Sequence, residues 1–173
     1  MGKSILGLQV SAKLQVGWIS TDLLLELLRL KNDEGVKTEW NASPERIIAD
    51  AQWFFPYFER FIWGVNSLAE NYVIEGVDFL PAQVVQLSAA YQIRCVFLGC
   101  SQMTLETFDR FPGRSRGYSS LPEEMRRQIV RDVPLWSELI RQEAERFGYP
   151  YLDMIGDFSQ RLNEAEAMLT TNS

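Results

Sequence analysis

YVIEGVDFLPAQVVQLSAAY, residues 72–91, decides the fold class expected for this chain. Its first six residues form an apolar run that carries one carboxylate, Glu75, a pattern typical of a buried strand that ends on an acid. Pro81 then begins a helix that we expect to reach Tyr91, because proline is favoured at the first helical position. One strand followed by one helix is the repeating unit of an α/β fold.

The same alternation continues in both directions along the chain. Further strands are expected at 16–19, 95–98 and 150–152, and further helices at 4–14, 22–31, 104–110, 121–147, 157–169 and from Ser43-Pro44-Glu45 through an aromatic-rich stretch. Proline inside a helix removes a hydrogen bond and crowds the preceding turn. Pro56 should therefore kink or split the aromatic helix, and Pro134 should bend the long charged one. Near-continuous apolar strands predict one α/β domain over residues 1–173 with a mostly parallel sheet.

Composition excludes several classes of function. The formal net charge of −6 argues against binding to a nucleic-acid polymer, and the absence of histidine excludes histidine-based acid/base catalysis and metal sites. Cys95 and Cys100 are expected to be reduced core residues of a cytoplasmic protein. We see no signal peptide, and no apolar run reaches the ~20 residues of a membrane helix. A membrane partner is therefore not expected, and the sequence does not indicate an oligomeric state.

The tripeptide Gly2-Lys3-Ser4 has the residues with which a phosphate-binding loop ends. In such a loop the glycine lets the backbone approach a phosphate, the lysine reaches the β- and γ-phosphates, and the serine hydroxyl binds Mg²⁺. A helix that follows directly would point its positive end at the anion. Three residues also arise by chance, so the tripeptide alone leaves both interpretations open.

Two strands are followed by acids. Asp22 follows the strand predicted at 16–19, and Glu75 and Asp78 end the strand within YVIEGVDFLP. Ligands of open α/β sheets bind beyond the carboxyl ends of the strands, where a carboxylate can hold Mg²⁺ or orient a hydroxyl nucleophile. The alternatives are a helix cap at Asp22 and ordinary solvated acids at the other two positions.

Three arginines, Arg110, Arg114 and Arg116, lie within DRFPGRSRGY, residues 109–118. Phosphoryl transfer spreads negative charge over several oxygens, and arginines stabilise that charge. After the two motifs above, the segment near 108–118 is expected to be an anion-binding lid. A solvated basic loop is the alternative.

Together these motifs resemble the P-loop kinases of small molecules and nucleotides. ISTDLLLELLR (19–29) and VIEGVDFLP (73–81) are most similar to 2-phosphoglycerate kinase and its relatives, although Asp78 stands where that family has histidine. The resemblance implies a three-layer α/β/α fold with ATP and Mg²⁺ as cofactors.

The resemblance also implies roles for individual residues. Phosphate contacts of ATP would come from Gly2, Lys3, Ser4 and Arg110, metal ligands from Ser4 and Glu75, catalytic groups from Lys3, Glu75, Arg114 and Arg116, and acceptor contacts from Asp22, Arg29 and Asp78. The first strand of that fold, which lies mid-sheet, and the start of its phosphate loop are missing from the sequence. We therefore expect the sheet to lack its first central strand and the natural protein to begin about ten or more residues upstream.

Two functions remain open at this point. The first is an ATP-dependent phosphotransferase that acts on a small molecule or nucleotide, with 2-phosphoglycerate-like acceptors included. The second is a non-catalytic, degenerate P-loop protein that binds a nucleotide or a protein partner. The aromatic cluster from Trp53 to Trp63 bears on the second, because exposed aromatic residues favour an interface whereas buried ones belong to a core.

Overall fold

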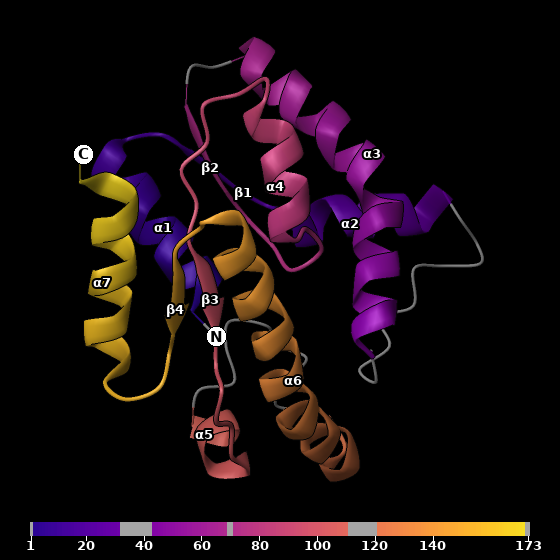
Figure 1. The fold of residues 1–173 in the computed structure, drawn as a ribbon, viewed down its shortest axis with the longest axis vertical. Coiled ribbons are helices and arrows are strands. Elements are labelled where there is room, and N and C mark those ends of the chain that lie inside the picture. The colour runs from indigo at the N-terminus through magenta and orange to yellow at the C-terminus, as the bar shows by residue number, and fades with distance from the viewer. Residues whose placement is uncertain (1, 32–42, 69–70, 111–120, 172–173) are drawn as a thin grey trace.

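The chain has a mixed α/β fold, with seven helices and four short strands among the residues described (Figure 1). This computed structural model describes residues 2–31, 43–68, 71–110 and 121–171. The predicted roles of Arg114 and Arg116 fall outside these ranges, as does most of the lid expected near 108–118. Among the described helices, none combines the length and the apolar character that crossing a membrane requires.

The order of elements follows the predicted alternation. They are α1 (Lys3–Leu14), β1 (Gly17–Ser20), α2 (Thr21–Lys31), α3 (Pro44–Leu68), β2 (Tyr72–Glu75), α4 (Pro81–Ser88), β3 (Phe97–Gly99), α5 (Leu105–Arg110), α6 (Glu123–Phe147), β4 (Tyr151–Asp153) and α7 (Phe158–Thr170). Several bounds differ from expectation by one to three residues; for example, α4 ends at Ser88 rather than Tyr91 and β3 begins at Phe97 rather than Cys95. Tyr91 and Cys95 instead belong to the segment that crosses from α4 to β3.

The described strands form two separate parallel pairs. β1 pairs with β2 so that Ser20 lies opposite Glu75, and β3 pairs with β4 so that Gly99 lies opposite Asp153. The prediction of parallel pairing is confirmed, whereas the expected single sheet stays a prediction, because the described strands form two separate pairs. Because both strands of the first pair run in the same direction, the residues that follow Ser20 and Glu75 emerge at one edge.

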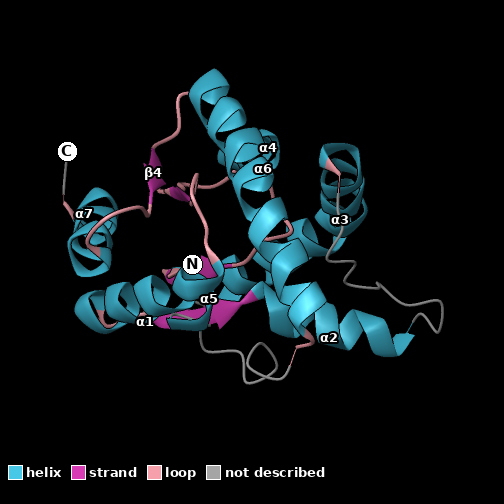
Figure 2. Cartoon of the chain, turned by 90° about the horizontal axis from the view of Figure 1, so that it is seen from below, coloured by secondary structure: helices cyan, strands magenta, loops and turns pink. Residues whose placement is uncertain are grey.

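Helices cover both faces of the two strand pairs. Val73 of β2 and Leu98 of β3 both pack against the cluster that α1 and α7 contribute. Successive strand residues point to opposite faces, and Ile74 accordingly packs with α2, α3 and α4, while Phe97 packs with α4 and α6. Figure 2 shows α1 and α7 together, on the other side of the molecule from α3. One face of each pair therefore meets α1 and α7, whereas on the opposite face the two pairs share α4 but otherwise meet different helices.

The aromatic helix α3 is continuous through Pro56. Its axis changes direction near the middle, where this proline lies (Figure 1). The predicted kink thus fits the path of the helix, and the predicted split is wrong. Phe54 and Phe58 flank the proline, are almost completely buried and stack with ring centroids 5.8 Å apart. Their packing holds both halves of the helix on the core and outweighs the hydrogen bond that proline removes. The long helix α6 likewise continues through Pro134.

The buried aromatic residue Phe54 should dominate the stability of α3. We expect Phe54→Ala to lower the free energy of unfolding by about 3–5 kcal/mol, because it removes a large side chain and leaves a cavity. Trp53→Ala on the more exposed side of the same turn is the matched control and should cost about 1 kcal/mol. Urea denaturation followed by circular dichroism measures both, and equal losses would contradict this assignment of the core.

Candidate functional site

The entry to α1 is set by Gly2. This residue has φ of +91°, in the left-handed region that glycine adopts without strain, and the chain then turns directly into the first helical residue, Lys3. Leu6 and Val10 bury one face of α1 against the cluster that includes Val73 of β2. The first turn of α1 is therefore carried to the carboxyl end of β2.

Four of the predicted site residues meet at this point. The ammonium Nζ of Lys3 lies 3.3 Å from Oε2 of Glu75 and 3.8 Å from Oδ2 of Asp22. The hydroxyl of Ser4 donates a hydrogen bond of 3.1 Å to Oε1 of Glu75. Residues from α1, β2 and α2 thus form one charged group, and we refer to Lys3, Ser4, Asp22 and Glu75 as the Lys3 cluster.

The two acids of the Lys3 cluster have different surroundings. The side chain of Glu75 is 7% exposed, whereas that of Asp22 is 55% exposed. Oε2 of Glu75 is buried and accepts no hydrogen bond among the described residues, so the nearby ammonium of Lys3 balances its charge through space. A buried carboxylate oxygen of this kind retains acceptor capacity for a cation or a proton donor.

The oxygen atoms of Ser4 and Glu75 fit Mg²⁺, which prefers oxygen ligands and commonly uses one or two carboxylates together with waters and substrate phosphates. The part of the chain that the structure describes contains no group of three or more acidic, cysteine or histidine side chains positioned to hold a metal. The Lys3 cluster therefore suits a cation that arrives with oxygens from a phosphate, and it is not a complete metal cage.

Thr21 and Gly76 bring the ends of β1 and β2 into direct contact. Thr21 is completely buried, and its Oγ1 makes no hydrogen bond within the described ranges. A Cβ atom at Gly76 would overlap this hydroxyl. The residues next to Asp22 and Glu75 are thus locked together. Sequence reasoning missed Thr21, for which the only signal was its place in the Ser-Thr-Asp sequence before α2.

The remaining predicted site residues have different outcomes. Asp78 is half-buried in the turn between β2 and α4, and Arg110 is exposed at the end of α5. Arg29 belongs to α2, but its side chain lies outside the described part of the structure. The structure therefore brings the Lys3 cluster together and leaves the predicted contacts of these three residues as predictions.

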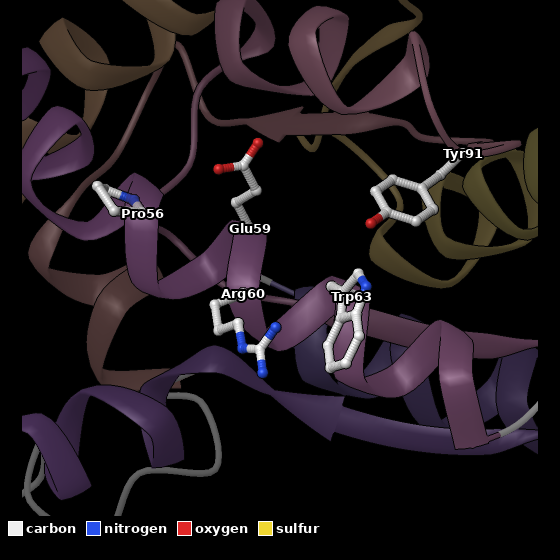
Figure 3. Close-up of a pocket in the computed structure, with 5 residues that line it drawn as sticks. All are labelled: Pro56, Glu59, Arg60, Trp63 and Tyr91. Carbon is white, nitrogen blue, oxygen red and sulfur yellow. The ribbon is translucent and has the colours of Figure 1, made fainter.

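A separate hollow lies on α3. A cavity of about 290 Å³ is lined by Pro56, Glu59, Arg60 and Trp63 of α3 and by Tyr91, which follows α4 (Figure 3). The guanidinium carbon of Arg60 lies 3.9 Å from the ring centroid of Trp63. No member of the Lys3 cluster lines this cavity, so it is a distinct surface.

Both cysteines are free thiols, as expected. Cys100 is buried, and its amide donates a hydrogen bond of 2.8 Å to Oγ of Ser137. Burial raises the pKa of the Cys95 thiol from 9.0 to about 11, and burial also raises the pKa of Cys100. High pKa values make both thiols poor nucleophiles at neutral pH.

No family model matches the chain, and comparisons with curated proteins and with solved structures found no match. The Lys3 cluster and its chemistry are therefore the basis on which we infer a function.

The contact between Gly76 and Thr21 should be intolerant of even a methyl group. Gly76→Ala is expected to destabilise the fold by about 1–3 kcal/mol, since the added Cβ overpacks a buried site. Gly64→Ala is the matched control, because nothing lies near a Cβ at this helical position, and it should be neutral or stabilising by up to about 1 kcal/mol. Thermal unfolding measures both. Thr21→Ala in the Gly76→Ala background should restore part of the loss, and a failure to do so would rule out this contact as the cause.

The raised pKa of Cys95 predicts slow alkylation and a pH-dependent stability. At pH 8 the thiolate fraction should be about 100-fold below that of a thiol with the ordinary pKa of 9.0. Iodoacetamide should therefore modify Cys95 slowly until urea unfolds the chain, which intact mass measures.

Because the unfolded thiol of Cys95 ionises near pH 9 and the folded one near pH 11, the unfolded chain loses its proton first. The free energy of unfolding should therefore fall as the pH rises from 9 to 11, and this thiol should not change it below pH 9. Cys95→Ala should reduce this dependence, to which Cys100 also contributes, and an unchanged profile would contradict the assignment.

Proposed function

We propose that the chain is an ATP-dependent phosphotransferase that acts on a small molecule or a nucleotide. The observation that carries the proposal is the Lys3 cluster: a lysine and a serine on the first turn of a helix, beside a buried carboxylate at the end of a parallel strand. Gly2, with its positive φ, precedes them as a phosphate loop requires. This proposal gives the protein ATP and Mg²⁺ as cofactors and a cytoplasmic location.

The same proposal extends to the fold, which we take to be a P-loop-kinase-like arrangement of three layers. The two strand pairs would be halves of one parallel sheet that lacks a strand between β2 and β3. The amide of Phe97 and the carbonyl of Gly99 make backbone hydrogen bonds on the β4 side of β3. The amide and carbonyl of Leu98, which lies between them, therefore face the opposite edge of β3. A hollow of about 210 Å³ beside β2 is lined by Ile74 and by Ile93 and Cys95 of the segment that leads into β3, which supports a gap between the two pairs.

Each member of the Lys3 cluster would have one task in this reaction. Lys3 would bind the phosphates of ATP, and Ser4 and Glu75 would hold Mg²⁺, which when bound neutralises charge that develops on the phosphate oxygens. Asp22 is the more exposed acid and is available to orient the hydroxyl of an acceptor. Asp78 and Arg29 would contact that acceptor. Arg110, Arg114 and Arg116 would close over both substrates and exclude water.

A second candidate function is non-catalytic binding of a protein partner through α3. Trp53, Tyr57 and Trp63 are between 36% and 51% exposed. A cavity of about 290 Å³ lies beside Trp63. These aromatic side chains and the cavity would offer a partner protein a partly apolar contact surface. A protein with this function alone would not turn over ATP.

Phosphoryl transfer separates the two functions. We expect Mg²⁺-dependent release of ADP from ATP in the presence of a small-molecule hydroxyl acceptor, and Lys3→Ala should lower kcat/KM by about 100-fold or more, since it removes a cationic contact to the transferring phosphate. The matched control is Lys13→Ala, on the last turn of the same helix, where the lysine pairs with Glu166 instead. Its turnover should stay near that of the wild type.

A coupled assay across a panel of sugars, hydroxy acids and nucleosides measures ADP release. Turnover that survives Lys3→Ala would exclude the proposed site. No turnover with any acceptor, together with a partner whose binding is lost on Trp63→Ala, would favour the second function.

A further inference from the structure

The ammonium that the proposed function assigns to phosphate is already engaged in this structure. Lys3 Nζ lies 3.3 Å from Oε2 of Glu75 and 3.8 Å from Oδ2 of Asp22. An anion that approaches Lys3 therefore meets two carboxylates as well. Anion binding requires that at least one of these ion pairs be given up or compensated.

The two ion pairs differ in what their loss costs. Lys3 can leave Asp22 easily, because an exposed carboxylate is solvated by water and surface ion pairs contribute little. Lys3 cannot leave Glu75 in the same way, because Glu75 is 7% exposed and its Oε2 would be left buried without a partner. The buried carboxylate thus holds the ammonium until another positive charge replaces it.

We propose that Glu75 is a lock on Lys3, which opens only when a divalent cation neutralises this carboxylate. The cation and the phosphate then bind as a coupled pair, and free anion alone binds poorly. This inference rests on the proposed function and adds a regulation of the same site.

The geometry of Ser4 supports this order of events. Its hydroxyl donates its hydrogen to Oε1 of Glu75 at 3.1 Å, while Lys3 lies against the other oxygen, Oε2. The lone pairs of the Ser4 hydroxyl remain available to a cation that lies beside Oε1. Lys3 and Ser4 therefore each contact one oxygen of the Glu75 carboxylate. A cation bound beside Ser4 would neutralise the same carboxylate that holds Lys3.

Thermodynamic linkage makes the proposal quantitative. If the cation strengthens anion binding by some factor, the anion strengthens cation binding by the same factor, and couplings of this kind are typically 5- to 150-fold. The lock also predicts that removing the charge of Glu75 raises the affinity for an anion in the absence of metal. Without this carboxylate, the ammonium of Lys3 is free to bind the anion.

Calorimetric titration with inorganic tripolyphosphate, with and without Mg²⁺, tests the lock on the full chain. The wild type should bind the probe at least about 5-fold more tightly with Mg²⁺. Glu75→Gln keeps the shape of the side chain and an acceptor for Ser4 but removes the charge. Its metal-free affinity should exceed that of the wild type by at least about 5-fold, and its affinity should no longer rise with Mg²⁺. Mg²⁺ also forms a complex with tripolyphosphate in solution. This effect on the apparent affinity is the same for the wild type and the variant, so it cancels when the two proteins are compared.

Glu166→Gln is the matched control, because Glu166 pairs with Lys13 at the far end of the same helix, at 2.6 Å. It should titrate like the wild type. If Glu75→Gln binds the probe without metal as weakly as the wild type does, the lock is wrong and the phosphate site stands. If neither protein binds the probe under any condition, the phosphate site and the lock both fail. If Glu75→Gln does not fold, as judged by circular dichroism, a wild type without Mg²⁺ coupling still overturns the lock.

Discussion

The buried carboxylate of Glu75 is the constraint on which the rest of this structure depends. A charged group in this position needs compensation, and the compensation comes from a helix that begins more than seventy residues earlier in the chain. Lys3 supplies the charge and Ser4 supplies a hydrogen bond. Any change in the docking of α1 therefore alters the environment of Glu75. Conversely, the position of β2 fixes where the start of α1 can lie.

Three kinds of contact hold α1 in place. Leu6 and Val10 pack into the cluster shared with α7, and Lys13 pairs with Glu166 of that helix. At the opposite end of α1, the Lys3 cluster joins it to β2 and α2. Apolar burial provides most of the driving force, and the polar contacts at the two ends fix the orientation of the helix about its axis. The site and the packing of α1 are thus one arrangement.

Most elements followed from local patterns, because apolar runs, proline at Pro81 and an acid at the end of a strand are each features of neighbouring residues. The rule for carboxyl ends of parallel strands predicted that Asp22 and Glu75 lie near one another, whereas Lys3 was assigned to the same site by the Gly-Lys-Ser motif, and its ion pairs with the two acids were not predicted. Local patterns did not reveal that α3 continues through Pro56, since this depends on how Phe54 and Phe58 pack. The buried role of Thr21 was missed for the same reason, as its contact with Gly76 is long-range.

The separation of the strands into two pairs has a consequence for how the chain folds. Each pair joins strands that are about 55 residues apart, so each must close a long loop before its backbone bonds form. Long-range parallel pairing is slow for this reason. Each pair also has its own helical partners, with α2 and α3 beside one and α6 beside the other. The N-terminal and C-terminal halves of the chain can therefore each begin to fold separately. Packing of α1 against α7 then joins the two halves. Hydrogen exchange in the native state would therefore resolve two cooperative units rather than one.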